Sequence, residues 1–385
     1  MSVTINENVQ TAAPTIIPDP VDTINVDRNV IDNYEKTIAE LRAEVNARVP
    51  MKLTFQQLIE QPPITREQMY EQSCSNDSVT VKFWRDKWVG HTRENMELYD
   101  FREHSSMKSF AKYACRPVVV AGSGPSLKKN AHHLKDKNEN IGLVSCLHNF
   151  AYFIDNEIKC DGYINMDAGD ITIPEMSQGG KHPEQYYWDA SKDQTLIAAS
   201  VTKPELIKRW QGDIQFFQAP IPDQAIMKEI WEITKGFGVF YNVGGNALGA
   251  TYYHARAILG GMPIAMIGAD FAFDYMHKFH SWDSPYDKQF DGVVPCTDIF
   301  GNRVYTWPSY LNFSKWFLSQ AMGGNGNNPM IMINCTEGGV LGAFPHGNVK
   351  HVHQMALVDF LHMYNHYTRK PEMVENPPDQ PKLLF

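Results

Sequence analysis

Residues Pro117 to Leu127, PVVVAGSGPSL, constrain the fold of this chain more than any other stretch. A continuous apolar run, Val118 to Ala121, leads into a Gly-Ser-Gly-Pro-Ser loop and then into a polar segment with helical spacing. Such a run bounded by turn residues is typical of a buried strand in a parallel sheet. Glycines permit a tight turn and a close approach to a ligand, and the amides at a helix start attract anions. The stretch therefore predicts a strand, loop and helix that hold phosphate.

The loop does not match either of the well-known phosphate-binding patterns. It lacks the third glycine of GxGxxG and the GKS or GKT of a Walker A loop. A plain tight turn is therefore the alternative interpretation, and the rest of the chain has to decide between the two.

Strand-like and helix-like patterns alternate along the chain after this loop. Short apolar runs typical of strands lie at 141–146, 162–166, 196–200, 214–217, 263–268 and 331–334. Helical patterns lie at 246–259, 305–322 and 349–367, a further helix carries Tyr152 to Ile154, and a glycine-containing connector spans 231–241. This alternation is typical of βαβ units, whose crossovers join parallel strands. The sequence predicts an α/β fold with a mostly parallel sheet.

The chain divides into four predicted regions. Residues 1–29 are polar and proline-containing and are expected to form a flexible arm. Residues 30–112 form a helical preamble, in which 30–49 has amphipathic spacing and 65–72 suggests a short helix. The amphipathic helix is expected to pack on the main domain or on a partner chain, so a homo-oligomer could form through it. Residues 113–368 are expected to form the main α/β domain, and 369–385 a loose tail.

Bulk composition excludes several functional classes. The net charge of −9 and the pI near 5.9 argue against a general nucleic-acid binder. No apolar run approaches the ~20 residues that a membrane span needs, and the N-terminus has no secretion signal. The six cysteines are scattered and contain no CxxC. We expect a reduced, cytoplasmic chain without a cysteine metal site.

Polar residues recur where the predicted strands end. They are Ser123, Asn149, Asp167, Asp270 and Asn334. Each by itself could be a helix cap or a turn residue. Together they indicate the ligand-binding edge of an open parallel sheet, where the carboxyl ends of the strands meet.

Several motifs, taken in this order, resemble one known domain family. VVVAGSGPSL and LVSCLHNFAYFIDNEIKCDGYINMDAGD are similar to the opening of the domain shared by the archaeal pterin diphosphokinase MptE and the bacterial motility-associated (Maf) glycosyltransferases. NVGGNALGATYYHARAILGGMPIAMIGADFAF, YTWPSYLNFSKWFLSQ and INCTEGGVLGAF resemble later Maf motifs. The likeness covers about residues 115–345. Nothing in the sequence excludes a phage origin, because such domains also occur in phage genomes.

The resemblance implies a Rossmann-like, sialyltransferase-like domain with helices on both faces of the sheet and a donor nucleotide near the glycine loops. MptE-like members transfer diphosphate from ATP to a hydroxymethylpterin with Mg²⁺. Maf-like members are thought to transfer a nonulosonic acid from a CMP donor to a protein hydroxyl. The sequence departs from the kinase pattern, since Asn165-Met-Asp167-Ala-Gly-Asp170 stands where a DLDG-like motif is expected.

The candidate ligand-binding residues follow from this reading. Phosphate contacts are expected from Gly122, Ser123, Gly124, Pro125 and Ser126, ribose or base contacts from Asn149, and donor contacts from Gly244, Gly245, Asn246, Asn334, Thr336, Gly338 and Gly339. The alternative for 244–246 is a plain helix start. Tyr305, Trp307 and Pro308 line the pocket or pack in the core.

The candidate catalytic residues are three carboxylates and a histidine. Asp167 and Asp270 could bind a metal, orient a sugar hydroxyl or act as a general base, with an N-cap as the alternative for Asp270. Glu337 has no evident structural duty, which suggests a hydroxyl contact or a base role. His280, with His277 near it, could take the acceptor's proton or stabilise the leaving phosphate. No partner set completes a histidine metal site, so no metal site is predicted.

Three functions remain open. The favoured one is a glycosyltransferase that uses a nucleotide-activated sugar, most simply a CMP-linked nonulosonic acid, with a protein or glycan hydroxyl as acceptor. The second is an MptE-like, Mg²⁺-dependent diphosphokinase that uses ATP. The third is a non-catalytic binding or structural module on the same fold.

Overall fold

The computed structural model describes residues 66–221, 223–273, 281, 294–321, 332–343 and 352–365, with backbone alone at 66–80, 294 and 308. All of them belong to one unit, residues 51–385. The predicted arm, the helix at 30–49 and the tail lie outside these ranges, and the four predicted region boundaries stay predictions.

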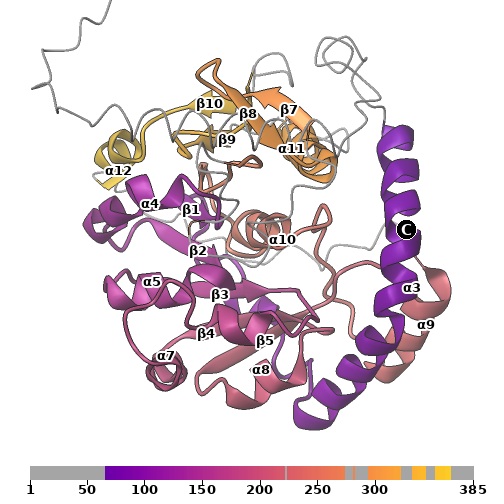
Figure 1. The fold of residues 1–385 in the computed structure, drawn as a ribbon. Coiled ribbons are helices and arrows are strands. Elements are labelled where there is room, and N and C mark those ends of the chain that lie inside the picture. The colour runs from indigo at the N-terminus through magenta and orange to yellow at the C-terminus, as the bar shows by residue number, and fades with distance from the viewer. Residues whose placement is uncertain are drawn as a thin grey trace, which may run out of the picture. The chain divides into compact units, whose positions relative to one another are not determined.

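An eight-stranded sheet organises the described part of the chain (Figure 1). Its order is β10-β9-β6-β1-β2-β3-β4-β5, and every neighbouring pair is parallel. The strands are β1 (Val118–Ala121), β2 (Gly142–Cys146), β3 (Gly162–Asn165), β4 (Thr195–Ala199), β5 (Asp213–Phe217), β6 (Ile264–Ile267), β9 (Met332–Asn334) and β10 (Val352–Gln354). The predicted α/β fold is confirmed.

Both faces of the sheet are buried, which explains why its strands are continuous apolar runs. In β4, Leu196 and Ala198 join one core cluster, whereas Ile197 and Ala199 join the other. Period-two alternation sends successive side chains to opposite faces, so a strand covered on both sides needs apolar residues throughout.

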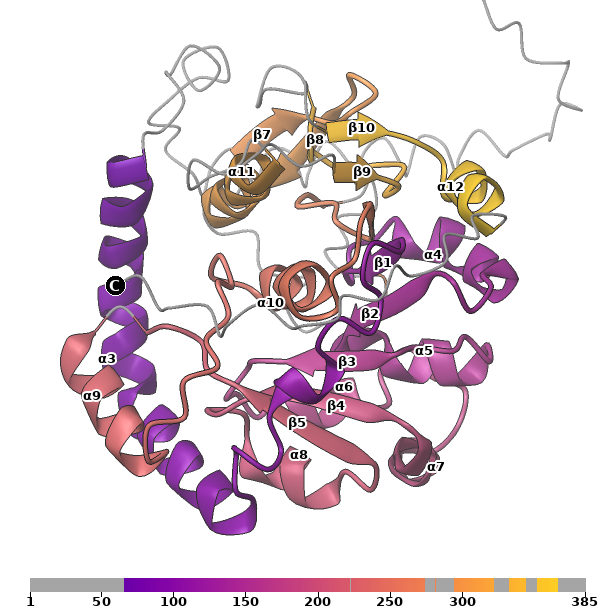
Figure 2. The ribbon, with the colours of Figure 1, turned by 180° about the vertical axis from the view of Figure 1, so that it is seen from behind.

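Helices cover each face, as the two opposite views show (Figures 1 and 2). The first cluster contains side chains of α4 (Leu127–Asn130), α5 (Phe150–Asp155), α7 (Glu184–Ala190), α8 (Pro204–Arg209) and α12 (Leu357–Asn365). The second contains side chains of α3 (Arg66–Leu98), α9 (Gln224–Ile233), α10 (Ala247–Tyr253) and α11 (Pro308–Ala321). Every helix in the described part of the chain is too short or too polar to cross a membrane.

The strand order reverses beside β1. The chain builds β1 to β5 outward on one side, and then returns to place β6 on the other side of β1. In open parallel sheets a ligand crevice forms outside the carboxyl ends of the strands at such a switch point. The loops after β1 and β6, which carry Gly122 to Ser126 and Gly268 to Asp270, meet at that point.

Three sequence-based helix predictions were wrong in detail. α3 is one 33-residue helix, where the sequence suggested a short helix at 65–72 within the helical preamble. α9 continues to Ile233, inside the predicted connector. Tyr305, expected in the helical region 305–322, lies in strand β8 (Arg303–Thr306), whereas the predicted entry into the helix through Pro308 is confirmed, since proline suits the first helical turn.

Three short strands toward the C-terminus, β7 (Val294–Thr297), β8 and β10, were missed. Residues Val352–Gln354, inside the predicted helix 349–367, pair with β9 as strand β10, and α12 begins at Leu357. β7 and β8 form a separate antiparallel hairpin. Each of these strands has only three or four residues and depends on pairing with another strand, which its own local pattern does not report.

The remaining described elements are short. They are η1 (Ser106–Ser109), η2 (Ala131–Asp136), η3 (Leu147–Asn149), α6 (Thr172–Glu175), η4 (Ser191–Asp193) and the π-helical turn η5 (His254–Ile258) that follows α10 directly.

Glycines allow the loops after β1 and β6 to touch. The Gly122 amide donates to the Ile267 carbonyl at 2.8 Å, and the Gly124 amide donates to the Gly268 carbonyl at 2.9 Å. A Cβ on Gly122 would lie 2.4 Å from the Gly268 oxygen, and one on Gly268 would lie 2.5 Å from the Gly122 oxygen. No larger residue fits at either position without moving backbone.

We therefore expect Gly122→Ala to lower the free energy of unfolding by about 2 kcal/mol or more, because the clash is with backbone. The matched control is Gly90→Ala in α3, where no atom lies within 4 Å of the new Cβ. That change should raise stability by ~0.5–1 kcal/mol through helix propensity. Urea unfolding followed by circular dichroism measures both. Equal effects of the two substitutions would contradict the close-contact role of Gly122.

Candidate active site

A cavity of about 530 Å³ opens at the carboxyl ends of the central strands. Six of the residues predicted from the sequence line it: Ser123, Gly124, Asp167, Asn246, Asp270 and Trp307. The remaining walls come from the ends of β2 and β3, from α6, from the start of α10 and from α11. The cavity therefore lies at the switch point of the sheet, where the fold predicts a ligand site.

Asp270 follows β6 and is held by the loop after β1. Its Oδ2 accepts a hydrogen bond from the Ser126 hydroxyl at 2.8 Å, and its Oδ1 accepts one from the Ser126 amide at 3.2 Å. The side chain is only 5% exposed. Burial raises the pKa of Asp270 to about 7, although both Ser126 hydrogen bonds oppose the shift. The carboxyl group can therefore exchange a proton near neutral pH.

The loop after β9 contacts the backbone around Asp270. The Thr336 hydroxyl accepts from the Ala269 amide at 3.1 Å, and the Val340 amide donates to the Asp270 carbonyl at 2.8 Å. A Cβ on Gly339 would lie 2.2 Å from the Asp270 carbonyl oxygen, and one on Gly338 would lie 3.5 Å from Oδ1. These predicted residues thus gather at Asp270, and they act on its backbone rather than as part of the cavity wall.

Three amides of the loop after β1 donate hydrogen bonds to other parts of the protein. Those of Gly122 and Gly124 donate to the β6 segment, and that of Ser126 donates to Asp270. A Cβ on Gly124 would lie 2.1 Å from Asp270 Oδ2, so this glycine makes room for the carboxylate. Phosphate binding by Gly122, Ser123, Gly124, Pro125 and Ser126 stays a prediction, and of these five residues Ser123 and Gly124 line the cavity.

Asp167 follows β3 and faces the cavity from a tethered loop. Its Oδ1 accepts from the Gly169 amide at 2.7 Å, and Lys203 Nζ lies 2.6 Å from Asp170 Oδ1 in the same loop. Desolvation by the surrounding protein, with the negative charge of Glu175, raises the pKa of Asp167.

A histidine–carboxylate pair in the cavity was missed at the sequence level. His148, in η3, places Nδ1 3.3 Å from Oε1 of Glu175, the last residue of α6, and both residues line the cavity. His148 stands beside Asn149 at the end of a predicted strand, which was a usable signal. The sequence around Glu175 gave no such signal, because only the fold brings this residue close to His148.

Three predicted residues have structural contacts. Asn149 is fully buried, and its amide donates to the Gly122 carbonyl at 2.9 Å. The Asn334 amide donates to the Leu341 carbonyl at 2.9 Å. Glu337 does have a structural duty, contrary to expectation, because its Oε1 accepts from the Leu357 amide at 3.0 Å at the start of α12. Their binding and catalytic roles stay predictions.

Gly244, Gly245 and Asn246 form the start of α10. Asn246 Oδ1 accepts from the Gly249 amide at 2.8 Å, which makes it the N-cap. A Cβ on Gly244 would lie 2.4 Å from the Trp316 ring, and one on Gly245 would lie 3.0 Å from Phe313. The two glycines therefore face α11, and of the three only Asn246 lines the cavity.

Aromatic side chains form one wall of the cavity. Trp307 and Tyr310 have ring centroids 5.2 Å apart, and Tyr310 and Phe313 have centroids 5.5 Å apart. All three line the cavity together with Phe271, the residue after Asp270. Tyr305 is not among the lining residues. His277, His280 and the side chain of Pro308 lie outside what the structure describes.

The charge of the cavity is acidic. Its described lining holds Asp167, Glu175 and Asp270, one histidine, and no lysine or arginine. Among the described residues, no three His, Cys, Asp or Glu side chains gather closely enough to hold a metal ion. Any divalent cation here would need ligands from its substrate as well.

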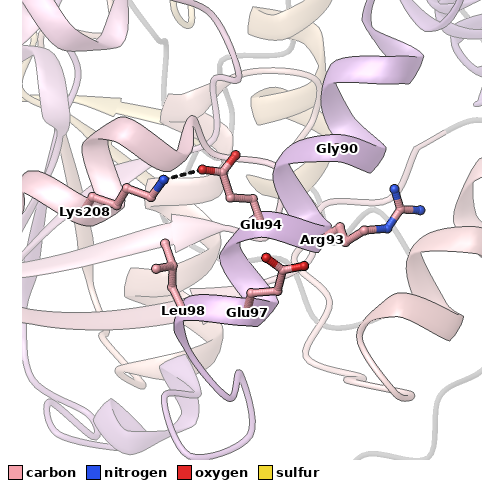
Figure 3. A pocket seen from close by; sticks show the side chains of 6 residues that line it. All are labelled: Gly90, Arg93, Glu94, Glu97, Leu98 and Lys208. Carbon is pink, nitrogen blue, oxygen red and sulfur yellow. Dashed lines mark hydrogen bonds and ion pairs between the residues drawn. The ribbon is translucent and has the colours of Figure 1, made fainter.

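A second depression, of about 360 Å³, lies on the surface between α3 and α8 (Figure 3). Lys208 and Glu94 are ion-paired across it, and Gly90, Arg93, Glu97 and Leu98 complete its lining. Exposed pairs of this kind contribute little energy. It contains none of the predicted site residues, so the larger cavity is the candidate active site.

Comparisons with known proteins agree with the sequence resemblance. Residues 92–275 match the family described as 6-hydroxymethylpterin diphosphokinase MptE-like. The structure of a Maf glycosyltransferase from Magnetospirillum magneticum AMB-1 matches 70% of this chain at 16% identity with a TM-score of 0.46. The match spans 38% of that protein's chain. No curated protein matches.

The raised pKa of Asp270 predicts a pH-dependent stability. A carboxyl group whose pKa is higher in the folded protein stabilises the fold when it is protonated, and that contribution is lost as the pH rises from about 4 to about 7. Asp270→Asn should therefore gain stability relative to wild type over this range, by at most about 4 kcal/mol. Urea unfolding at several pH values measures the difference.

Asp136→Asn is the matched control, because Asp136 is exposed and outside the cavity. The control should follow the wild-type pH dependence. If Asp270→Asn also follows it, Asp270 is not a buried carboxyl group with a raised pKa.

Proposed function

We propose that this chain is a transferase that moves a glycosyl group from a nucleotide-activated donor to a hydroxyl group, with the donor bound in the 530 Å³ cavity. The observation that carries the proposal is the pairing of a polar floor, formed by strand ends, with an aromatic wall. Ligand pockets typically measure about 300–1,000 Å³ and combine apolar walls with a few placed polar groups.

The aromatic wall suits a nucleotide base. Trp307, Tyr310 and Phe313 follow one another at three-residue steps and all reach the cavity. Stacking on such rings contributes about 1–3 kcal/mol per base. In this proposal the base packs against α11, and the sugar and phosphate face the strand ends.

The polar floor suits a sugar more than a polyphosphate. Asp270 can accept hydrogen bonds from sugar hydroxyls when ionised and donate one when protonated, with its pKa about 7. The three carboxylates of the lining repel phosphate, and no described lysine or arginine offsets them. A donor with one phosphodiester, such as a CMP-linked nonulosonic acid, carries less negative charge into the cavity than ATP does. The acceptor proposed is a protein or glycan hydroxyl.

A Mg²⁺-dependent diphosphokinase is the second candidate, and the MptE-like match favours it. Mg²⁺ is usually bound through one or two carboxylates together with substrate phosphates. Asp167, Glu175 and Asp270 supply such oxygens in the cavity. Under this alternative Mg²⁺ would enter with ATP and neutralise its phosphates, and the aromatic wall would stack on the pterin.

Thermal stability in the presence of ligands separates the candidates. We expect CMP to stabilise the protein without Mg²⁺, by about 2.7 kcal/mol at 100 times its dissociation constant. Tyr310→Ala should weaken CMP binding about tenfold, because a stacking partner is lost. Phe300→Ala, which removes a ring that is 67% exposed and outside the cavity, is the control and should leave binding unchanged.

Each other outcome has a defined meaning. Stabilisation by ATP alone, and only with Mg²⁺, would favour the diphosphokinase. No shift with CMP, CDP, UDP, GDP, ADP or ATP would favour the non-catalytic module. Equal losses in the two aromatic variants would show that CMP binds outside the cavity.

A further inference from the structure

The donor site described above leaves His148 and Glu175 without a role. His148 is only 7% exposed, whereas the Glu175 side chain is 18% exposed and lines the cavity. The 3.3 Å contact between His148 Nδ1 and Glu175 Oε1 joins the end of β2 to α6, across 27 residues of chain. The more open member of the pair is therefore the carboxylate, and the more buried member is the imidazole.

We propose that Glu175 is the catalytic base that takes the proton of the acceptor hydroxyl, and that His148 is the positioning residue that orients it. The proposal rests on the proposed glycosyl transfer and deepens it by naming the group that activates the acceptor.

The three carboxylates of the cavity differ in how many of their oxygens already accept hydrogen bonds from the protein. Both Asp270 oxygens accept hydrogen bonds from Ser126, and Asp167 Oδ1 accepts one from the Gly169 amide. Glu175 Oε1 faces the imidazole, and no hydrogen bond from the described residues holds Oε2. Glu175 and Asp167 therefore each keep an oxygen available for a hydroxyl in the cavity, and Glu175 is the one of the two whose other oxygen faces a histidine rather than a backbone amide.

His148 supplies the orientation that a flexible glutamate needs. An N–H at Nδ1 that donates to Oε1 restricts the rotation of the carboxylate and directs its second oxygen. Such an orienting contact keeps a catalytic group in a productive geometry, although the orienting residue does not touch the reacting atoms. The buried position of His148 suits that role.

The neighbouring groups are consistent with a base at this position. Asp167, after β3, feels the Glu175 charge, which contributes to the raised pKa of Asp167. Cys146, at the end of β2, is buried and has its pKa raised to about 12, so its thiol stays neutral beside the pair. The pKa shifts of Asp167 and Cys146 therefore both favour the neutral forms of these two groups.

The chemical step balances without any further reagent. The acceptor oxygen forms a bond to the anomeric carbon of the donor, and its proton passes to Glu175. The bond between the anomeric carbon and the phosphate oxygen breaks, and its electron pair leaves with CMP. General bases of this kind accelerate transfer by about 10²–10⁴-fold.

CMP release from CMP-N-acetylneuraminate, with water as the acceptor, tests the proposal in the full chain. Glu175→Gln should slow release about 100-fold or more and leave the dissociation constant for CMP unchanged, because the loss is in the chemical step. His148→Leu should also slow release. His148→Asn, whose amide nitrogen can replace Nδ1, should restore most of it. Glu139→Gln, at an exposed site outside the cavity, is the matched control.

Two results would overturn the proposal while the proposed function stands. One is wild-type release by Glu175→Gln, and the other is equal release by His148→Leu and His148→Asn, which would give His148 a purely packing role. A wild-type protein that releases no CMP would instead overturn the proposed glycosyl transfer itself, and the role of Glu175 would fall with it.

Discussion

The close contact between the loops after β1 and β6 is the constraint on which the site depends. Gly122 and Gly268 let two backbones approach to a distance that no side chain allows, and this approach places Ser126 against Asp270. A carboxyl group at that position is buried, and its pKa rises to about 7. By allowing the loops after β1 and β6 to touch, the glycines thus contribute to the burial that raises the pKa of Asp270. This role differs from the phosphate binding that their spacing suggests.

The sequence was sufficient to predict those parts of the fold that depend on local hydrophobic pattern. Continuous apolar runs predicted the parallel strands, because β1, β4 and β6 are buried on both faces. Polar residues after those strands predicted the site edge, and Asp270 and Asp167 do line the cavity. The family resemblance was found again over residues 92–275.

Features made by distant pairing could not be predicted from local pattern. Strand β10 exists because β9 lies beside it, and the His148–Glu175 pair exists because α6 packs next to the end of β2. From the sequence alone, Glu337 had no evident structural contact in its loop. Only the position of α12 shows that its side chain accepts a hydrogen bond from the Leu357 amide. The sequence placed the residues around Asp270 at one edge of the sheet, but it did not separate those that line the cavity from those that contact Asp270.

Backbone strain at two of these loops supports a preorganised site. Phe271 and Glu337 have φ values of 49° and 57°, a region that side chains other than glycine rarely adopt. Such residues cost about 1–3 kcal/mol each and persist only where neighbours hold them. The Thr306 hydroxyl donates to the Phe271 carbonyl at 2.5 Å, and Glu337 is held by Leu357. Hydrogen bonds from neighbouring segments therefore hold both of these residues in place, one of them directly after Asp270.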